Sequence, residues 1–164
     1  MSKTYGVSVK QILAGAPEAD GSMSQNLADV GKIYKDSVSF VEADPSVTRH
    51  FSEGSKYPFL AVLTSGELPF KFTIVDISAD NLAKWLGGAA AANVWNGPAE
   101  EFSQELSLKI VSAYGTDILV CRAFVYGKIT WNMTRTEIAK IDITAEVMLP
   151  EDGITSPVIS QPSA

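Results

Sequence analysis

The feature of this sequence that most constrains its fold is a strict alternation of apolar and polar residues in its second half. Between residues 136 and 148, one side of an extended chain carries Ala139, Ile141, Ile143, Ala145 and Val147, and the other carries Lys140, Asp142, Thr144 and Glu146. A shorter stretch repeats the pattern, with Leu106, Leu108 and Ile110 alternating with Ser107 and Lys109. Because successive side chains of a strand point to opposite faces, this pattern predicts half-buried β-strands. The chain is therefore predicted to be mainly β.

Further segments are predicted to be extended: 4–13, 33–42, 46–51, 57–63, 68–76 and 118–131. The acidic turn at 43–45 predicts a hairpin of 33–42 with 46–51, followed by a mobile loop at 52–56. Segments 57–63 and 68–76 are joined by a short turn at 65–67. Segment 118–131 has apolar residues on both faces, which predicts a central strand.

One short helix is predicted between residues 78 and 86. Ser78 is a suitable N-cap, Asp80 lies in the first turn where a negative charge is favourable, and Gly87 with Gly88 ends the helix. The apolar stripe consists of Leu82, Trp85 and Leu86. Because such a short helix is marginal in isolation, we expect this stripe to pack on the sheet.

The length of 164 residues and the apolar content of 46% predict one domain with its own core. We place this domain at residues 1–150. The stretch 87–98, rich in Ala, Gly and Asn, fits a connection between strands. After Pro150 the sequence becomes polar and rich in proline, so residues 151–164 are predicted to form a flexible tail.

Composition limits the cellular setting and the partners. Residues 1–4 carry one positive charge and no apolar stretch follows them, so we predict no secretory signal and synthesis in the cytoplasm. No apolar run is long enough to predict insertion into a membrane. The formal charge of −6 argues against tight binding of nucleic acid. It suits a surface past which DNA slides without sticking, and it equally suits a protein that is acidic for solubility.

Residues able to carry out catalysis are sparse. His50 is the one histidine and is predicted to be an exposed strand residue, and Cys121 is the one cysteine and is predicted to be a buried, inert thiol. The pair 127–128 lacks the flanking residues of a phosphate-binding loop. Glu100, Glu101 and Glu105 lack the spacing of a calcium site. We therefore predict a protein that is not an enzyme and that needs no cofactor or metal.

Two stretches resemble the tail-tube proteins (major tail proteins) of bacteriophages, which are related to the tube proteins of contractile injection systems. The first comprises 34–40, 42–48 and 51–54, a hairpin with an acidic turn before proline and then a Glu-Gly loop. The second is the helix segment 78–88, which follows the middle strands as it does in those proteins. The resemblance covers roughly residues 33–148.

The resemblance implies a β-sandwich or barrel-like subunit that closes into hexameric rings, in which strands of neighbouring subunits continue one inner β-barrel. The rings stack into a tube that conducts DNA in a phage or delivers protein effectors in an injection system. Such a subunit is part of the virion tail and is assembled in the cytoplasm of the host bacterium. Its partners are further copies of itself, with the tape measure, sheath, tail terminator and baseplate proteins as additional contacts.

The resemblance also implies two sets of site residues. The predicted subunit or ring interface comprises Asp36, Asp44, Pro45, Phe51, Glu53 and Tyr57. The predicted lumen-facing residues are Glu105, Lys109, Lys140, Asp142 and Glu146. An ordinary surface loop and an ordinary solvent-exposed sheet face would account for the same residue types.

Two other functions fit the sequence. A small β-barrel that binds a ligand would use the three Trp, five Tyr and seven Phe residues as pocket lining. A hydrolase that uses carboxylates would depend on Glu101 or Glu105. We rank both below the tube subunit, because neither has a motif of its own.

Overall fold

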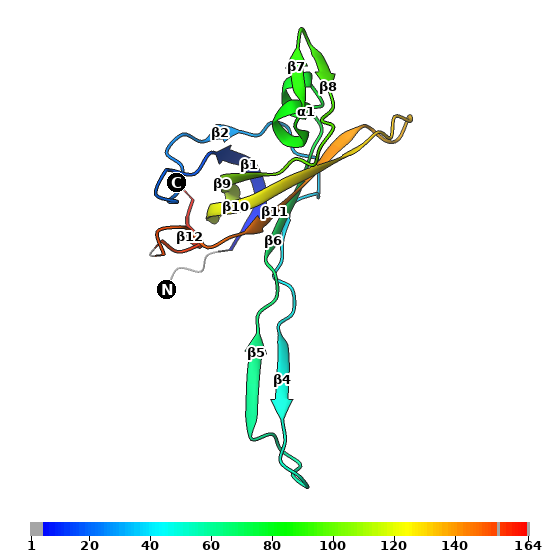
Figure 1. Cartoon of the computed structure of the whole chain (residues 1–164). Coiled ribbons are helices and arrows are strands. Elements are labelled where there is room, and N and C mark those ends of the chain that lie inside the picture. The colour runs from blue at the N-terminus through cyan, green and yellow to red at the C-terminus, as the bar shows by residue number, and fades with distance from the viewer. Residues whose placement is uncertain (1–4, 154, 164) are drawn as a thin grey trace.

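The structure, a computed structural model, describes residues 5–153 and 155–163. Within these ranges the protein is mainly β, with one large antiparallel sheet, two small hairpin sheets and a single short helix packed against the strands (Figure 1). This confirms the predicted fold class. Residues 1–4, on which the prediction of no secretory signal depends, lie outside the described ranges.

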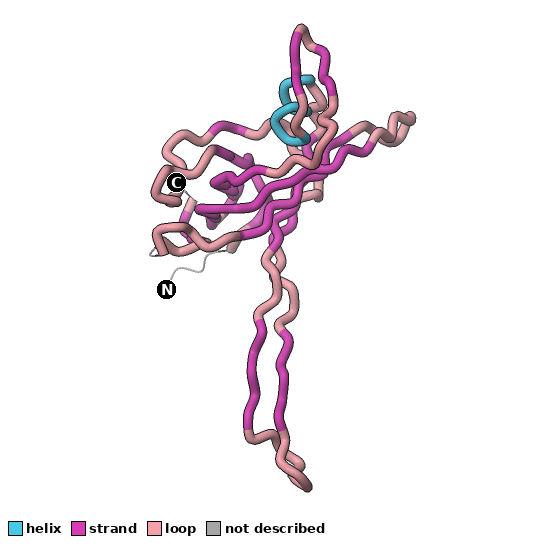
Figure 2. The backbone as a smooth tube through the Cα atoms, viewed as in Figure 1, coloured by secondary structure: helices cyan, strands magenta, loops and turns pink. Residues whose placement is uncertain are grey.

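The elements follow one another along the chain as strands, a helix and long closing strands (Figure 2). They are β1 (Val7–Gly15), β2 (Ala28–Asp29), β3 (Ser39–Phe40), β4 (Ser46–His50), β5 (Leu60–Thr64), β6 (Pro69–Ile74), α1 (Ala79–Leu86), β7 (Ala89–Ala91), β8 (Val94–Asn96), β9 (Gln104–Tyr114), β10 (Thr116–Thr130), β11 (Lys140–Val147) and β12 (Val158–Pro162).

The large sheet has the order β2-β1-β9-β10-β11-β6-β3, and β12 also pairs with β10. Strand β10 is long enough to hold two partners along one of its edges. Residues 123–130 pair with β11, and residues 116–120 pair with β12 beyond the point where β11 ends. The opposite edge of β10 pairs with β9. The predicted central position of segment 118–131 is therefore confirmed.

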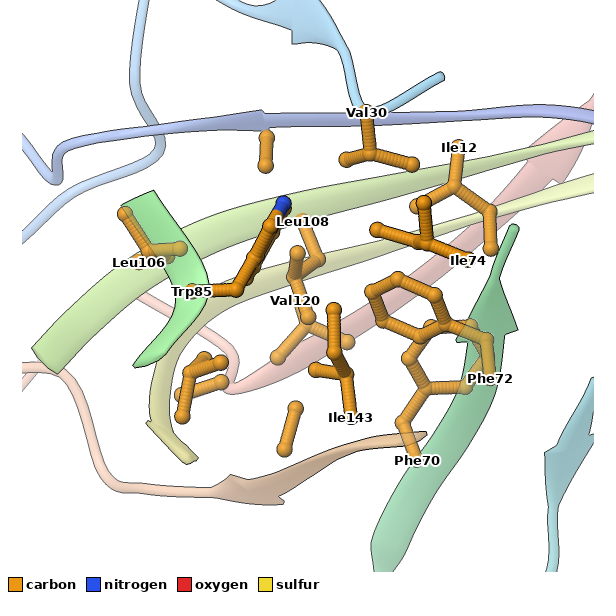
Figure 3. Packing of buried hydrophobic residues seen from close by; sticks show 14 of the residues in the cluster. Ile12, Val30, Phe70, Phe72, Ile74, Trp85, Leu106, Leu108, Val120 and Ile143 are labelled. Atoms are coloured by element: carbon orange, nitrogen blue, oxygen red, sulfur yellow. The ribbon is translucent and has the colours of Figure 1, made fainter. Parts of the chain in front are cut away.

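The core lies on one side of this sheet and is lined by alternate residues of its strands (Figure 3). Ile141, Ile143 and Ala145 of β11 are fully buried, whereas the residues between them are half-buried, as the alternation predicts. Phe72 of β6 makes an edge-to-face contact with Trp85 of α1, with 6.0 Å between the ring centroids. Each buried side chain of this size contributes roughly 1.5–3 kcal/mol to the free energy of unfolding.

Helix α1 begins and ends close to where the sequence predicts. Ser78 occupies the N-cap position, although its side chain makes no capping hydrogen bond. Gly87 follows the last turn with a φ of 80°, a conformation that favours glycine. Leu82 and Trp85 are buried and Leu86 is half-buried, so the predicted packing of this stripe is confirmed. Trp85 Nε1 is buried without a hydrogen-bond partner among the described atoms.

The predicted strand 33–42 is broken, and its predicted partner is wrong. Tyr34 to Ser37 form a turn, in which Ser37 N–H donates to Tyr34 O and Asp36 adopts a φ of 59°. Only Ser39–Phe40 remains as a strand, and it pairs with β6. Segment 46–50 pairs instead with 60–64. Segments 57–63 and 68–76, which the predicted turn 65–67 joins, consequently lie in different sheets.

The connection 87–98 contains a hairpin, β7–β8. Its two-residue turn, Ala92 and Asn93, has positive φ values of 50° and 62°. Positive φ at both central residues is the geometry that matches the twist of a two-residue hairpin. Trp95 Nε1 donates to Gly87 O at 2.9 Å, which ties this hairpin to the end of α1.

The C-terminal segment differs from the flexible tail predicted for residues 151–164. Residues 158–162 form β12 on the edge of β10, and Ser163 Oγ donates to Asp117 Oδ1 at 2.6 Å. Cys121 N–H donates to Pro157 O. A polar, proline-containing sequence is extended here because the edge of β10 supplies the missing backbone partners.

Candidate functional site

A two-stranded ribbon, which we call the arm (residues 41–68), extends from the body of the protein (Figure 1). It continues the ladder that β3 makes with β6. Phe40 lies opposite Phe70, and six residues further along Ser46 lies opposite Thr64. Between these two pairs, Ala43 N–H donates to Glu67 O at 2.8 Å. The arm is thus an extension of the body's hairpin in the same register.

The base of the arm requires a close approach of two backbones. A Cβ on Gly66 would lie 2.2 Å from Ala43 O and 2.6 Å from Ala43 C. Such distances are shorter than any side chain tolerates, so glycine is the residue that lets the two strands leave the sheet together. The acidic residues Glu42, Asp44 and Glu67 lie in this same region and are exposed.

The arm presents apolar side chains to solvent. All residues of β4 and β5 are exposed. Strand β5 is apolar at four successive positions, 60–63, a pattern typical of strands buried on both faces. The exposed fraction of the residue is 63% for Leu63 and 70% for Phe59. The other large exposed apolar residues of the arm are Val41, Val47, Phe51, Tyr57, Leu60 and Val62.

Isolated two-stranded hairpins are marginally stable in water, and apolar surfaces on both faces destabilise them further relative to a covered state. No layer formed by residues 5–153 or 155–163 covers the strands of the arm, because each of their residues is exposed. Uncovered apolar surface of this kind is typical of interaction sites between proteins.

Five of the six predicted interface residues lie on the arm. Asp44 and Pro45 precede β4, and Phe51, Glu53 and Tyr57 lie at the tip, where Ser55 N–H donates to Ser52 O in a turn. All five are exposed. The sixth, Asp36, lies on the body in the turn before β3. Whether any of them contacts another subunit stays a prediction, as does the mobility of residues 52–56.

The five predicted lumen residues share one face of β9 and β11, the face opposite to the core. Strand β10 lies between them, and its Phe124 is directly opposite both Glu105 and Glu146. Lys109 and Lys140 are half-buried. Asp142 accepts hydrogen bonds from Thr73 Oγ1 at 2.8 Å and from Thr130 Oγ1 at 3.2 Å. The orientation of this face toward a lumen stays a prediction.

Ser107, expected on the same polar face, is fully buried. Its Oγ donates to Cys121 O at 2.6 Å and accepts from Ser24 N–H at 3.1 Å. This end of the face is covered because the chain around Ser24 and the segment before β12 fold over it. Alternation identified the face of Ser107 correctly but gave no sign of a second layer.

Arg122 lies at the edge of that covered region and forms several hydrogen bonds there. Its guanidinium donates to both carboxylate oxygens of Glu105, at 2.9 and 2.7 Å, and to Leu149 O at 3.2 Å. These hydrogen bonds from Arg122 lower the pKa of Glu105 below its usual value. Glu105 is therefore paired within its own chain rather than available as a free carboxylate.

Sequence reasoning did not single out the aromatic residues of this face. Phe124 and Tyr126 of β10 are 36% and 39% exposed, and their ring centroids are 6.0 Å apart. The signal was present in the apolar character of both faces of 118–131. It was interpreted as a sign of central position alone.

The residues considered for catalysis are dispersed. His50 lies exposed at the end of β4 on the arm. Cys121 is buried, its Sγ donates to Ser156 O at 3.3 Å, and burial followed by the nearby charge of Asp152 raises the pKa of its thiol. The described ranges hold no group of three or more His, Cys, Asp or Glu residues placed to bind a metal. Nor do they contain a helix with the length and apolar content needed to cross a membrane.

No protein-family model matches the sequence. No curated protein matches it either. Among solved structures, the chain is similar to one described as the cryo-EM structure of the anti-feeding prophage cap, the AFP tube-terminating cap. The two are 12% identical over 99% of this chain and 95% of that chain, with a TM-score of 0.43. A likeness of this degree does not assign a function, which must be argued from the residues of this chain.

Proposed function

We propose that this protein is a non-enzymatic structural subunit that assembles with copies of itself into rings, and that the rings stack into the tube of a phage tail or of a related injection machine. The observation that carries this proposal is the arm. A ribbon with uncovered apolar residues on both faces is stable in water only when another surface covers it. In a protein built to polymerise, that surface is a further subunit.

The sequence resemblance to tail-tube proteins supports the same class and gives the expected assembly, a hexameric ring. In such a ring the sheet face that carries Glu105, Lys109, Lys140, Asp142 and Glu146 lines the lumen. These five residues comprise three carboxylates and two lysines, and the same face also carries Lys71 and Lys128, opposite Thr144 and Asp142. The net charge of the whole chain, −6, repels the phosphate backbone, so DNA passes without adhering during ejection.

The proposal also places the protein among its partners. As a tube subunit it belongs to the virion tail, is assembled in the cytoplasm of the host bacterium, and contacts the tape measure, sheath, terminator and baseplate proteins at the ends and surfaces of the tube. An inner tube that delivers protein effectors would use the same subunit geometry.

The ligand-binding alternative has little support in the packing. The aromatic residues it would need for a pocket are used in two other ways. Phe70, Phe72 and Trp85 fill the core, whereas Phe51 and Phe59 lie uncovered on the arm. The carboxylate hydrolase also lacks support, because Glu105 is engaged by Arg122 at 2.7 Å.

Negative-stain electron microscopy of the purified chain, with light scattering over a range of concentrations and salt, tests the proposal. We expect rings with a central hole and, at higher concentration, stacked tubes. Rings that never stack would contradict the proposed tube but would support the proposed ring. A protein that stays monomeric under all conditions would contradict the proposal as a whole.

The role of the arm is tested by replacing residues 44–66 with Asn-Gly, a two-residue turn that joins the paired Ala43 and Glu67. We expect the variant to keep the β-sheet circular dichroism and melting temperature of the body and to form no rings or tubes. Tubes of normal length from this variant would show that the arm is not an assembly element.

A further inference from the structure

The large sheet curls until its two ends face each other across a gap, which we call the seam. One side of the seam is β1 and the other is the segment 33–40 with the start of β6. Two surface hollows lie along it, and both are lined by Ser8, Val9 and Val38. The barrel-like body is therefore open along one line.

The β1 side of the seam has an edge without a partner strand. Strand β2 pairs only with Leu13 and Ala14, so among the described residues no strand covers the outer edge of 7–11. Ser8 has a φ of 59°, and the register with β9 shifts between Val9 and Gln11. Bulges of this kind protect an edge from uncontrolled pairing while leaving its backbone groups accessible to a specific partner.

The floor of the seam is apolar. The hollow of about 200 Å³ at its open end is lined mainly by the side chains of Val7, Val9, Val38, Phe40, Phe70, Ile110 and Ile118. Val7 is 55% exposed, and Val9, Val38, Phe40 and Ile118 are half-buried. A strand that entered this hollow would bury apolar side chains on the same surface where it found free backbone groups.

We propose that the seam of one copy receives β5 of the arm of a second copy as an added strand. Three properties of the chain meet in this pairing: an unpaired edge, an apolar floor and a strand that is apolar at 60–63. Strand addition of this kind takes its affinity from backbone hydrogen bonds and its specificity from pockets for alternate side chains. The inference rests on the proposed function and specifies its interface.

The arm and the seam are different surfaces of one chain. Repeated head to tail, their contact generates a closed ring or an open stack, whereas reciprocal exchange between two copies gives a two-fold dimer. In the described fold, β5 does not pair with the seam of its own chain, since every residue of β5 is exposed. A single type of contact therefore accounts for both uncovered surfaces.

Disulfide trapping between copies tests the pairing. Leu63→Cys and Val38→Cys are made as separate variants in the native background, where Cys121 is buried and its thiol donates a hydrogen bond to Ser156 O. The two are mixed in equal amounts and oxidised with copper–phenanthroline. We expect a cross-linked dimer of the two variants at least tenfold more abundant than in a mixture of Leu63→Cys with Thr144→Cys, which lies on β11 away from the seam.

The outcomes separate this inference from the proposed function. If tubes form but the cross-link between positions 63 and 38 does not, the proposed pairing of β5 with the seam is wrong and the proposed tube subunit stands. The same conclusion follows if Leu63→Cys cross-links only to Leu63→Cys of another copy. Absence of any assembly by unmodified protein would instead overturn the proposed function. A cross-link confined to assembled fractions would support both.

Discussion

The body and the arm are built from similar strands, yet the body buries its apolar residues and the arm exposes them. In β11 every second residue is apolar and is buried in the core, and the residues between are half-exposed. In β5 four successive residues are apolar and all are exposed. The comparison teaches that apolar content alone does not locate a core. What matters is whether another layer of the same chain lies within reach.

The body obtains that layer by curling the sheet and by placing α1 over it. The arm leaves the sheet through the close contact of Gly66 with Ala43 and passes beyond any covering element. Mutations in the body should therefore change the free energy of unfolding, and mutations in the arm should change assembly. The predictions below test this separation.

The largest effect is expected in the body at Trp85. Trp85→Ala removes a fully buried indole from between α1 and β6, and we expect a loss of roughly 3–5 kcal/mol in the free energy of unfolding, measured by denaturant titration. Trp85→Phe is the matched control. It should cost clearly less, because it also removes the unpaired Nε1–H group. Equal losses in the two variants would contradict this account.

In the arm, Leu63→Lys should leave stability unchanged and disrupt assembly. Leu63 is 63% exposed in the single chain and its cross-strand partner Val47 is also exposed, so its replacement removes little internal contact. We expect the concentration needed for assembly to rise at least tenfold, about 1.4 kcal/mol, in a light-scattering titration, with the melting temperature unaltered. Thr64→Lys is the control, because Thr64 points to the other face and is paired with the polar Ser46. A fall in melting temperature for Leu63→Lys would show that the arm has an internal partner.

The junction between the two regions is tested by Gly66→Ala. The added Cβ collides with the Ala43 backbone, so we expect the hydrogen bond from Ala43 N–H to Glu67 O to lengthen or break. Hydrogen exchange at the Ala43 amide should accelerate, while the amides of β9 and β10 keep their protection. Acceleration throughout the sheet would mean that arm and body unfold as one unit.

The smallest effect concerns the Glu105–Arg122 pair. The pKa of Glu105 is lowered in the folded protein, so ionised Glu105 stabilises the fold above its unfolded pKa, and this stabilisation is lost as the pH falls through the folded pKa. Titration by NMR should place the Glu105 pKa below the value usual for glutamate. Arg122→Gln should raise it toward the usual value. An unchanged pKa in Arg122→Gln would rule out the ion pair as the cause.

The candidate site was only partly predictable. Turn chemistry at 52–56 predicted the exposed loop. The assignment of Phe51, Glu53 and Tyr57 to an interface came from the resemblance to tail-tube proteins and stays a prediction. The seam was not identified, because no local pattern in 7–11 or 33–40 shows that these segments border one gap. The aromatic pair Phe124–Tyr126 was likewise overlooked, since apolar residues on both faces of a strand indicate a central position and equally an exposed patch.

The sequence by itself determined those features that depend on neighbouring residues. Alternation in 136–148 and 106–110 fixed the strands and their buried faces, and the stripe of Leu82, Trp85 and Leu86 with the glycines after it fixed the helix. These signals are local because side-chain direction follows directly from backbone geometry.

Tertiary structure alone decided which strands pair and which faces are covered. The register of the body hairpin continued into the arm, so 46–50 paired with 60–64 and not with 33–42. The edge of β10 beyond the end of β11 pairs with 158–162, and the chain around Ser24 lies over Ser107. Backbone hydrogen-bonding groups are the same at every residue, so their partners depend on which edges the whole fold brings together.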